Sequence, residues 1–212
     1  RIVREQFCLV AVGITAAVLA TGSFALLTWA ANLLSAVLAM AGLLFYVVVY
    51  TMILKRRTWH NIVIGGAAGA FPPLVGWAAV TNDLTPFAWV LFAIVFVWTP
   101  VHFWALAMLI KDDYAEAGVP MLPVVRSEHM TVVQIALYTF LTAVVSIIPL
   151  FQGEAGYVYL VGAMLLNAVL VVRTFRLYQK PDRPNALWLF KYSMVYLALL
   201  FMMIAIDRAQ WM

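Results

Sequence analysis

The stretch that decides the fold is "FAWVLFAIVFVWTPVHFWALAMLI", residues 87–110, which contains no Asp, Glu, Lys or Arg. A bilayer core about 30 Å thick is crossed by roughly 20 apolar residues in a helix, so this run is long enough to span it. The run is unbroken and lacks the alternation of apolar and polar residues that is typical of a strand. A helix also satisfies its own backbone hydrogen bonds inside lipid. The stretch therefore predicts a membrane-spanning helix.

Six other stretches have the same character. The predicted spans are 7–29, 33–53, 61–81, 87–110, 131–151, 156–175 and 188–206. The 212-residue chain is 66% hydrophobic and 10% charged, whereas a soluble domain is about 45–50% apolar and about 25% charged. No linker or soluble segment divides the chain. We therefore expect an all-α, polytopic transmembrane helical bundle that forms a single membrane-embedded domain over residues 1–212.

The basic residues predict the orientation in the membrane. The segments that flank the spans alternate between two sides of the membrane. Every Lys and Arg except Arg208 falls in the segments of one side, which are "RIVREQ", "LKRRTWHN", "IKDDYAEAGVPMLPVVRSEHM" and "RTFRLYQKPDRPNALWLFK". The positive-inside rule makes this the cytoplasmic face. Membrane orientation also explains the basic pI of about 9.3, so we expect no nucleic-acid partner. The single cysteine, Cys8, excludes an internal disulfide and a cysteine-based metal cluster.

The basic loop "LKRRTWHN", residues 54–61, has two interpretations. Lys55, Arg56 and Arg57 are typical of a stop-transfer cluster held by anionic lipid, at about 1 kcal/mol per basic residue. They could instead bind a diphosphate, since Lys is a compact charge and Arg a planar fork of donors. Pattern alone favours the first interpretation.

The stretch "GGAAGAFPPLVGW", residues 65–77, is also open to two interpretations. Gly65 and Gly69 are spaced for close packing of helices. Pro72 and Pro73 lack amide hydrogens and should disturb the helix, and freed carbonyls at membrane depth are tolerated only beside protein or a cavity. Tight packing is one interpretation, and a cavity wall beside a bulky ligand is the other.

His102 is an ionisable residue inside a predicted span, and such residues usually face the interior of a bundle. It is either a neutral histidine hydrogen-bonded to a neighbour, or a ligand to a metal centre or polar substrate. Trp98 and Trp104 are either interfacial aromatic residues or surfaces on which a flat substrate stacks.

The acidic segment "KDDYAEAG", residues 111–118, follows that span directly. Glu116 follows Asp112 by four residues and Asp113 by three, so a continuing helix would place these carboxylates on neighbouring faces. Magnesium is usually held by one or two carboxylates together with substrate phosphates. The alternative is a solvated acidic helix end, which periodicity favours. The following "GVPMLPVV" is expected to be an ordered loop that lies along the membrane and covers a site.

The stretch "YTMILKRRTWHNIVIGGAAGAFPPLVGWAAVT" followed by "WTPVHFWALAMLIKDDYAEAGVPMLPVV" closely resembles the protoheme IX farnesyltransferases, or haem O synthases, among the intramembrane aromatic prenyltransferases. The resemblance implies nine helices around a central cavity in a bacterial inner membrane, with the active site on the cytoplasmic face. It implies transfer of a farnesyl group from farnesyl diphosphate to a vinyl group of haem b, giving haem O for terminal oxidase biogenesis. Mg²⁺ is the implied cofactor, and haem A synthase or oxidase assembly proteins are implied partners.

The resemblance also implies roles for individual residues. The implied catalytic residues are Asp112, Asp113 and Lys55, and the implied magnesium ligands are Asp112, Asp113 and Glu116. The implied diphosphate-binding residues are Tyr50, Lys55, Arg56, Arg57, Asn61 and Lys111. The implied haem-binding residues are His102, Trp98, Trp104 and Tyr114.

The sequence departs from the family pattern in one large respect. This chain has seven predicted spans, whereas the family has nine. The family's first acidic motif, with Asn and Asp at four-residue spacing, does not occur in this sequence. The span 7–29 then corresponds to the family's third helix, and residues 1–6 to the end of a loop. We therefore expect the isolated chain to be inactive or nearly so. The alternatives are a prenyltransferase acting on a quinone precursor, a non-catalytic haem-binding membrane protein, and a carrier for a lipid-like solute.

Overall fold

The structure is a computed structural model that describes the backbone of residues 2–209 and the side chains of residues 11–208. Every regular element in this part of the chain is a helix. The elements are α1 (Ile2–Ala30), α2 (Leu33–Leu44) with its π-helical continuation η1 (Phe45–Leu54), α3 (Asn61–Thr81), α4 (Pro86–Leu109), α5 (Lys111–Glu116), α6 (Leu122–Val125), α7 (Glu128–Ser146), α8 (Ile148–Phe151), α9 (Tyr157–Gln179) and α10 (Arg183–Ala209).

Seven helical segments of the described chain are long and apolar enough to cross a membrane. They cover residues 11–30, 33–54, 61–81, 86–109, 128–151, 157–179 and 183–208. The predicted all-α class and the seven predicted spans are therefore confirmed. The prediction that residues 1–6 form a loop is wrong for residues 2–6, which already belong to α1; Arg1 lies outside the described residues.

Two predicted spans differ from the structure because polar residues and proline decide their ends. The last span begins at Arg183 rather than at residue 188, because the Asp182 carboxylate accepts a hydrogen bond from the Asn185 amide at 3.0 Å and caps a polar first turn. The predicted span 131–151 is interrupted at Ile147, between the end of α7 and the start of α8 at Ile148, and Pro149 lies in the first turn of α8. Proline has no amide hydrogen and fits the beginning of a helix.

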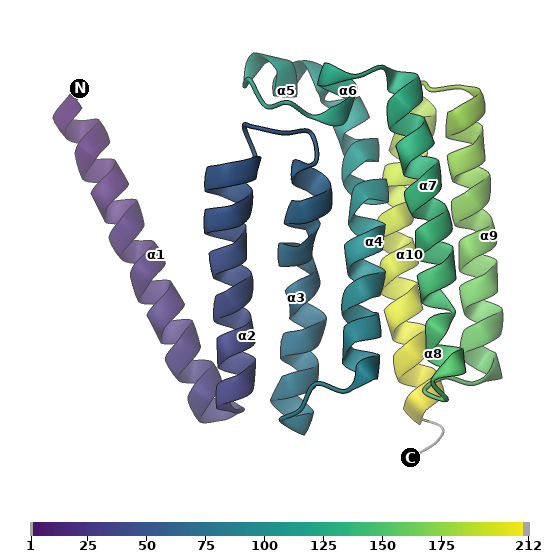
Figure 1. Ribbon diagram of the computed structural model, residues 1–212, viewed down its shortest axis with the longest axis horizontal. Coiled ribbons are helices and arrows are strands. Elements are labelled where there is room, and N and C mark those ends of the chain that lie inside the picture. The colour runs from purple at the N-terminus through teal and green to yellow at the C-terminus, as the bar shows by residue number, and fades with distance from the viewer. Residues whose placement is uncertain (1, 210–212) are drawn as a thin grey trace.

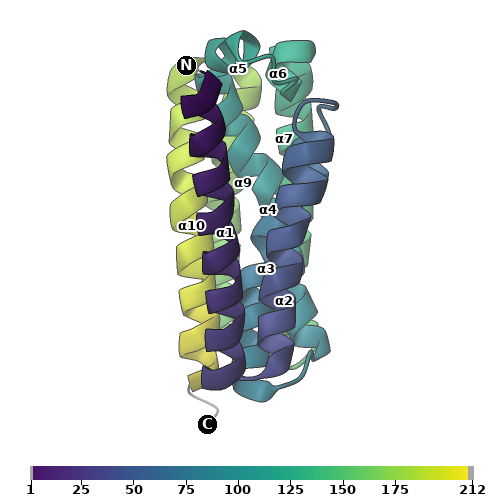
Figure 2. The ribbon, with the colours of Figure 1, turned by 90° about the vertical axis from the view of Figure 1, so that its left-hand side faces the viewer.

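The long helices lie side by side along a common axis (Figures 1 and 2). Helices α4, α7, α9 and α10 form a compact group, from which α3, α2 and α1 extend in that order (Figure 1). More than half of the most apolar stretch of α4 is buried, whereas none of the corresponding stretch of α1 is. The centre of the protein is therefore α4, and the apolar surface of α1 stays exposed.

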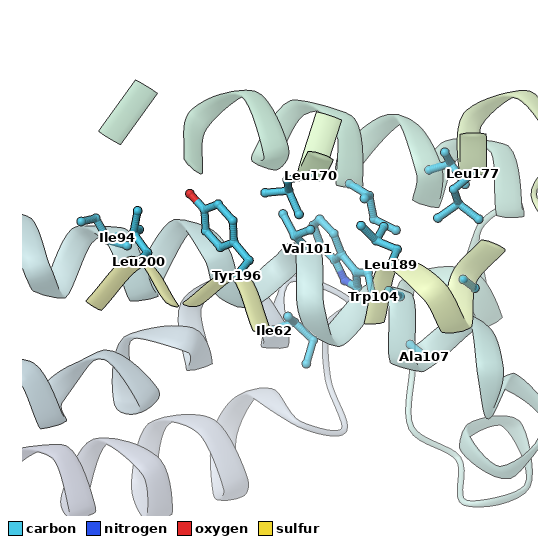
Figure 3. Packing of buried hydrophobic residues seen from close by; sticks show 14 of the residues in the cluster. Ile62, Ile94, Val101, Trp104, Ala107, Leu170, Leu177, Leu189, Tyr196 and Leu200 are labelled. Carbon is cyan, nitrogen blue, oxygen red and sulfur yellow. The ribbon is translucent and has the colours of Figure 1, made fainter. Parts of the chain in front are cut away.

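The core of the compact group combines apolar packing with a few internal hydrogen bonds. Fully buried residues such as Trp104, Leu189 and Tyr196 meet between the helices (Figure 3). The Tyr196 hydroxyl donates to Asn167 Oδ1 at 2.8 Å, and Asn167 Nδ2 donates to Ser146 Oγ at 2.9 Å. Helices in lipid associate through packing and such interhelical bonds, so this chain of bonds ties α7, α9 and α10 together.

The two ends of the bundle differ in charge. The connections at residues 55–60, 110–127 and 180–182 lie at the end marked N in Figure 1, and of the described basic residues only Arg208 lies at the other end. At that other end, the buried Asp207 carboxylate accepts hydrogen bonds from the amides of Gly156 and Tyr159. The basic residues that the sequence places in alternate connections are thus gathered at one end of the bundle.

Candidate active site

A cavity of about 800 Å³ opens between α2, η1, α3 and α4. This volume lies within the range of about 300–1,000 Å³ that is usual for small-molecule sites. Its walls are apolar, made of glycine and aromatic residues together with a few aliphatic ones. The glycines are Gly42, Gly65, Gly66, Gly69 and Gly76, and the aromatic residues are Tyr46, Tyr50, Phe71, Trp98 and Phe103.

The glycines of α3 have different roles in shaping this cavity. A Cβ atom on Gly65 would overlap the ring of Tyr50, and one on Gly66 would lie 3.0 Å from Thr99 Cγ2 of α4. A Cβ atom on Gly69 or Gly76 would meet nothing within 4 Å. The predicted packing role is therefore confirmed for Gly65 and wrong for Gly69, which leaves space in the cavity instead.

The two prolines of α3 do not break the helix, which continues from Asn61 to Thr81. Because Pro72 and Pro73 have no amide hydrogen, the carbonyls four residues earlier, on Ala68 and Gly69, lack their helical partners. Both of these residues border the cavity. The prolines therefore place two free acceptors at an apolar wall, and the predicted disruption is limited to lost hydrogen bonds.

A π-helical segment carries two tyrosines to the opposite wall. In η1 the Lys55 amide bonds the Tyr50 carbonyl, five residues back, at 2.8 Å. The rings of Tyr46 and Tyr50 lie 5.4 Å apart, and both line the cavity. Such wide helical turns are frequent at functional sites. Nothing in the sequence pattern indicated the π-helix, although the four-residue spacing of the tyrosines put them on one face.

The basic loop lies at the charged end of the cavity. Tyr50 before the loop and Ile62 after it both line the cavity. Lys55 is half-buried, whereas Arg56 and Arg57 are exposed, and none of the three forms an ion pair within the described residues. These cations are therefore available to an anion at this end.

Asn61 holds the basic loop in place. Its side chain is buried, and its Nδ2 donates to the Lys55 carbonyl at 3.2 Å. One of the two side-chain N–H donors of Asn61, a predicted diphosphate-binding residue, is therefore already used. Asn61 Oδ1 has no partner among the described residues, and a buried polar atom without a partner costs about 1–3 kcal/mol. This oxygen is suited to a water molecule or to the hydration shell of a cation.

The acidic segment forms the short helix α5, which lies across the same end of the bundle as the basic loop (Figure 1). Asp112, Asp113 and Glu116 are exposed. Within the described residues, no three His, Cys, Asp or Glu side chains gather closely enough to hold a metal ion. The predicted three-carboxylate set is therefore not assembled by these residues alone. Asp112 and Asp113 fit the smaller contribution of one or two carboxylates that magnesium usually receives beside phosphates.

The other two predicted residues of α5 have protein partners. Lys111 forms an ion pair with Glu128 of α7 at 3.3 Å, and both side chains are exposed, so this pair contributes little to stability. Tyr114 is half-buried and packs against the hydrophobic core. Burial raises the pKa of the Tyr114 phenol, so Tyr114 remains a neutral hydroxyl that can donate a hydrogen bond. Tyr114 thus anchors the acidic segment to the core of the bundle.

The loop after α5 is ordered, as predicted, but it packs into the protein rather than along lipid. Val119, Met121 and Leu122 are all buried in the hydrophobic core. Gly118 makes the turn, with a φ of 63° that favours glycine. The loop therefore fixes α5 over the end of the bundle.

The three predicted haem contacts of α4 separate into two groups. Trp98 lines the cavity, and His102 stacks on its ring at 4.6 Å. Trp104 is fully buried in the core (Figure 3). Its ring is edge-on to that of Tyr138, with the two centroids 5.5 Å apart. The interpretation of Trp104 as a substrate-stacking surface is wrong, because six residues at 3.6 residues per turn carry it to a different face of α4 from Trp98.

His102 has a defined set of neighbours. Its Nδ1 lies 2.8 Å from Ser193 Oγ of α10, and its ring is sandwiched between Trp98 and Phe190. Of the two interpretations that the sequence left open, the hydrogen bond to a neighbour is observed. Ser193 and Phe190 carried no signal in the sequence, since a serine and a phenylalanine in an apolar helix are common.

The site thus joins an apolar cavity to a charged end. The cavity accommodates a long apolar chain, Lys55, Arg56 and Arg57 can bind an anionic head group, and Asp112 and Asp113 can bind a cation that accompanies it. This arrangement suits an amphiphile with an extended hydrocarbon tail and a polyanionic head.

Comparison with known proteins agrees with this geometry. The chain is similar to the protoheme IX farnesyltransferase of Thermus thermophilus, with 64% identity over 191 residues that cover 90% of this chain and 31% of the relative. It is 58% identical to that of Deinococcus radiodurans over 182 residues, covering 83% of this chain and 58% of the relative. It is 54% identical to that of Gloeobacter violaceus over 193 residues, which cover 91% of this chain and 63% of the relative.

The chain therefore spans between about a third and two thirds of the length of these relatives. No solved structure gives a significant match. Residues 1–204, nearly the whole chain, match the UbiA prenyltransferase family. The chain belongs to the UbiA prenyltransferase family.

Proposed function

We propose that this chain forms the prenyl-diphosphate site and part of the acceptor site of a membrane-embedded enzyme that transfers a farnesyl group from farnesyl diphosphate to a vinyl group of haem b. The product is haem O. The observation that carries the proposal is the apolar cavity of about 800 Å³, bordered by Tyr50 and Ile62 on either side of the basic loop, at the end of the bundle across which α5 lies (Figure 1). The relatives named protoheme IX farnesyltransferase support the choice of farnesyl and haem.

The first chemical step is ionisation of the allylic carbon–oxygen bond. Lys55, Arg56 and Arg57 offset the charge of the diphosphate, so the electron pair of the breaking bond leaves with it. Charges positioned at a leaving group in this way supply electrostatic stabilisation, often the largest catalytic contribution. Mg²⁺ bound by Asp112 and Asp113 would add further positive charge at the same leaving group.

The second step forms the new carbon–carbon bond. The electron pair of the haem vinyl group attacks the allylic cation, and water then adds to the resulting haem-side cation and loses a proton. The ring faces of Tyr46, Trp98 and Phe103 line the cavity and stabilise a passing cation by cation–π contact. The same apolar walls keep water away from the allylic cation.

We propose that this site faces the cytoplasm of a bacterial cell and that the chain acts as one membrane domain. The positive-inside distribution supports this orientation, because both the basic loop and α5 lie at the basic end. Haem O released there would pass to haem A synthase or to terminal oxidase assembly.

Product analysis tests the proposal directly. Haem b, farnesyl diphosphate and magnesium are added to membranes containing this chain, or a version extended by the two helices that the family resemblance implies, and haem O is sought by mass. We expect haem O from the extended version and little or none from the chain alone. A parallel reaction of the extended version receives 4-hydroxybenzoate in place of haem b. Prenylated 4-hydroxybenzoate there, with no haem O in the reaction that contains haem b, would favour the quinone-precursor alternative and overturn the haem assignment.

Binding of farnesyl diphosphate to the 212-residue chain tests the site without turnover. We expect Arg57→Ala and Asp113→Asn to weaken binding about tenfold or more, and the Asp113→Asn variant to lose its dependence on magnesium. Arg126→Ala, an exposed cation at the same end, is the matched control and should bind normally. Equal losses in all three variants would indicate a general surface-charge effect and contradict the proposed site.

A further inference from the structure

The hydroxyl of Ser193 is shared between two partners. Its Oγ lies 2.8 Å from His102 Nδ1 and 2.7 Å from the Phe190 carbonyl oxygen. A serine hydroxyl carries one proton, and a carbonyl oxygen can only accept. A separation of 2.7 Å between two oxygens is a hydrogen-bond distance, so the Ser193 proton lies between Oγ and the Phe190 carbonyl. The proton between Ser193 and His102 must then come from Nδ1.

This assignment fixes the tautomer of His102. A neutral imidazole carries one N–H, and the other nitrogen keeps its lone pair. With the proton on Nδ1, the nitrogen with the lone pair is Nε2. No hydrogen bond to Nε2 is found within the described residues. The one hydrogen bond made by the ring thus leaves its only basic nitrogen unused.

The orientation of the ring is fixed as well. The ring centroids of Trp98 and Phe190 lie 4.6 and 4.7 Å from that of His102, at interplanar angles of 17° and 25°. The Trp98 indole N–H donates to the backbone carbonyl of Ser193 at 2.8 Å. Ser193 therefore bonds both His102 and the tryptophan on which His102 stacks.

The histidine stands directly behind the wall of the cavity. Trp98 and Phe103 both line that cavity, and the Phe103 ring is edge-on to His102 at 5.2 Å. His102 itself remains 9% exposed, so it is not sealed in the core as Trp104 is. His102 does not itself line the cavity, so a ligand there has to displace the ring of Trp98 or Phe103 to reach it.

We propose that Ser193 is a positioning residue that holds His102 as the Nδ1–H tautomer and so presents the Nε2 lone pair to the iron of haem. Histidines that bind metal almost always donate their other ring N–H to a neighbouring acceptor, and the hydroxyl of Ser193 is that acceptor here. The identity of the ligand rests on the proposed function, whereas the tautomer does not. The hydrogen bond at Nδ1 and binding of a metal at Nε2 are therefore compatible.

The tautomer is tested by nitrogen NMR of the chain labelled with ¹⁵N-histidine in detergent. The chain has three histidines, and the signal of His102 is assigned by its loss in His102→Gln. We expect the proton on Nδ1 in the unaltered chain, a mixture of tautomers in Ser193→Ala, and restoration in Ser193→Thr. A proton on Nε2 in the unaltered chain, or no change in Ser193→Ala, would overturn the positioning role.

Ser35→Ala is the matched control. Ser35 is fully buried, and its hydroxyl donates to the carbonyl three residues earlier, Asn32, at 2.9 Å, as Ser193 does to Phe190. It has no histidine partner. We expect this variant to leave the nitrogen signal of His102 unchanged. If Ser35→Ala alters that signal, loosening of a helix explains the effect of Ser193→Ala, and the positioning role of Ser193 is contradicted.

Binding of haem b is measured from the shift of its main absorption band. Removal of the group that hydrogen-bonds to a metal-ligating side chain typically weakens metal binding about 10- to 100-fold. We expect the affinity for haem b to fall by that factor in Ser193→Ala and to recover in Ser193→Thr. If haem binds the unaltered chain and Ser193→Ala equally, the positioning role fails. If the Nδ1–H tautomer is present but haem does not bind, the haem assignment and the proposed function fail instead.

Discussion

Replacement of Gly69 by tryptophan tests whether the cavity holds the hydrocarbon tail of the substrate. A Cβ atom at this position meets nothing within 4 Å, and Gly69 lines the cavity. The new side chain therefore has space to enter without displacing the helices. It would occupy volume that we assign to the farnesyl group.

The expected size of the effect comes from the contact area lost. An aromatic side chain buries about 150–250 Å², so an indole in the cavity removes roughly 200 Å² of contact from the tail. At about 25 cal/mol per Å² this corresponds to about 5 kcal/mol as an upper limit. Since the tail can shift to other parts of the cavity, we expect a loss of about 2–5 kcal/mol in binding free energy, which is a roughly 30- to 4,000-fold weaker affinity.

The assay is the affinity of the chain for farnesyl diphosphate in detergent, together with thermal unfolding to show that the fold is intact. Gly13→Trp on α1 is the control, because a Cβ atom there also meets nothing within 4 Å and Gly13 does not line the cavity. Gly76 lies about 10 Å further along α3, at 1.5 Å per residue. We expect Gly76→Trp to weaken farnesyl diphosphate more than geranyl diphosphate, because it shortens the cavity from its far end.

The reasoning would be refuted by a folded Gly69→Trp protein that binds farnesyl diphosphate as tightly as the unaltered chain. The tail would then lie elsewhere, for example against the exposed surface of α1. An equal loss in Gly13→Trp would point to the same conclusion, since that residue is outside the cavity.

Three further predictions concern stability. Gly65→Ala should lower the unfolding temperature, because its Cβ overlaps the Tyr50 ring and overpacking costs about 1–3 kcal/mol. Asp207→Asn should lower it too, because a buried carboxylate that accepts two backbone hydrogen bonds loses its charge, and bonds to charged groups contribute about 1.5–3 kcal/mol each. The hydrogen bond from the Asn185 amide, and then the bonds from Lys180, lower the pKa of Asp182 below its ordinary 3.8. The contribution of Asp182 to stability is thus present above pH 3.8 and lost as the pH falls through the lower pKa of the folded state, which amide hydrogen exchange at the start of α10 will detect.

Each of these has its own control. Gly69→Ala, where the added Cβ has free space, should leave the unfolding temperature nearly unchanged, and an effect equal to that of Gly65→Ala would contradict the overlap with Tyr50. An unchanged unfolding temperature in Asp207→Asn would show that the carboxylate charge is not needed there. Asp182→Asn should abolish the pH dependence of local stability that amide hydrogen exchange detects at the start of α10. If that pH dependence persists in the variant, another titrating group is responsible for it.

The sequence by itself determined the helical class, the seven spans and the end of the bundle at which the basic residues gather. These properties depend on one stretch at a time, because each span must be long and apolar enough to cross lipid and must satisfy its own backbone. That Tyr50, the basic loop and the acidic segment belong to one site was implied by the family resemblance, because the residue pattern alone favoured a lipid-held basic cluster and a solvated acidic helix end. Span lengths and residue types carried the helical class and the spans without any knowledge of how the helices pack.

Only the tertiary structure decided which face each residue presents and to which neighbour. Trp98 and Trp104 look equivalent in the sequence, yet one lines the cavity and the other is sealed in the core. Gly65 and Gly69 look like a packing pair, yet only the first meets a neighbour. The bond between His102 and Ser193 joins residues 91 positions apart. Such relations depend on helix rotation and close approach, which an almost uniformly apolar sequence does not encode in its local pattern.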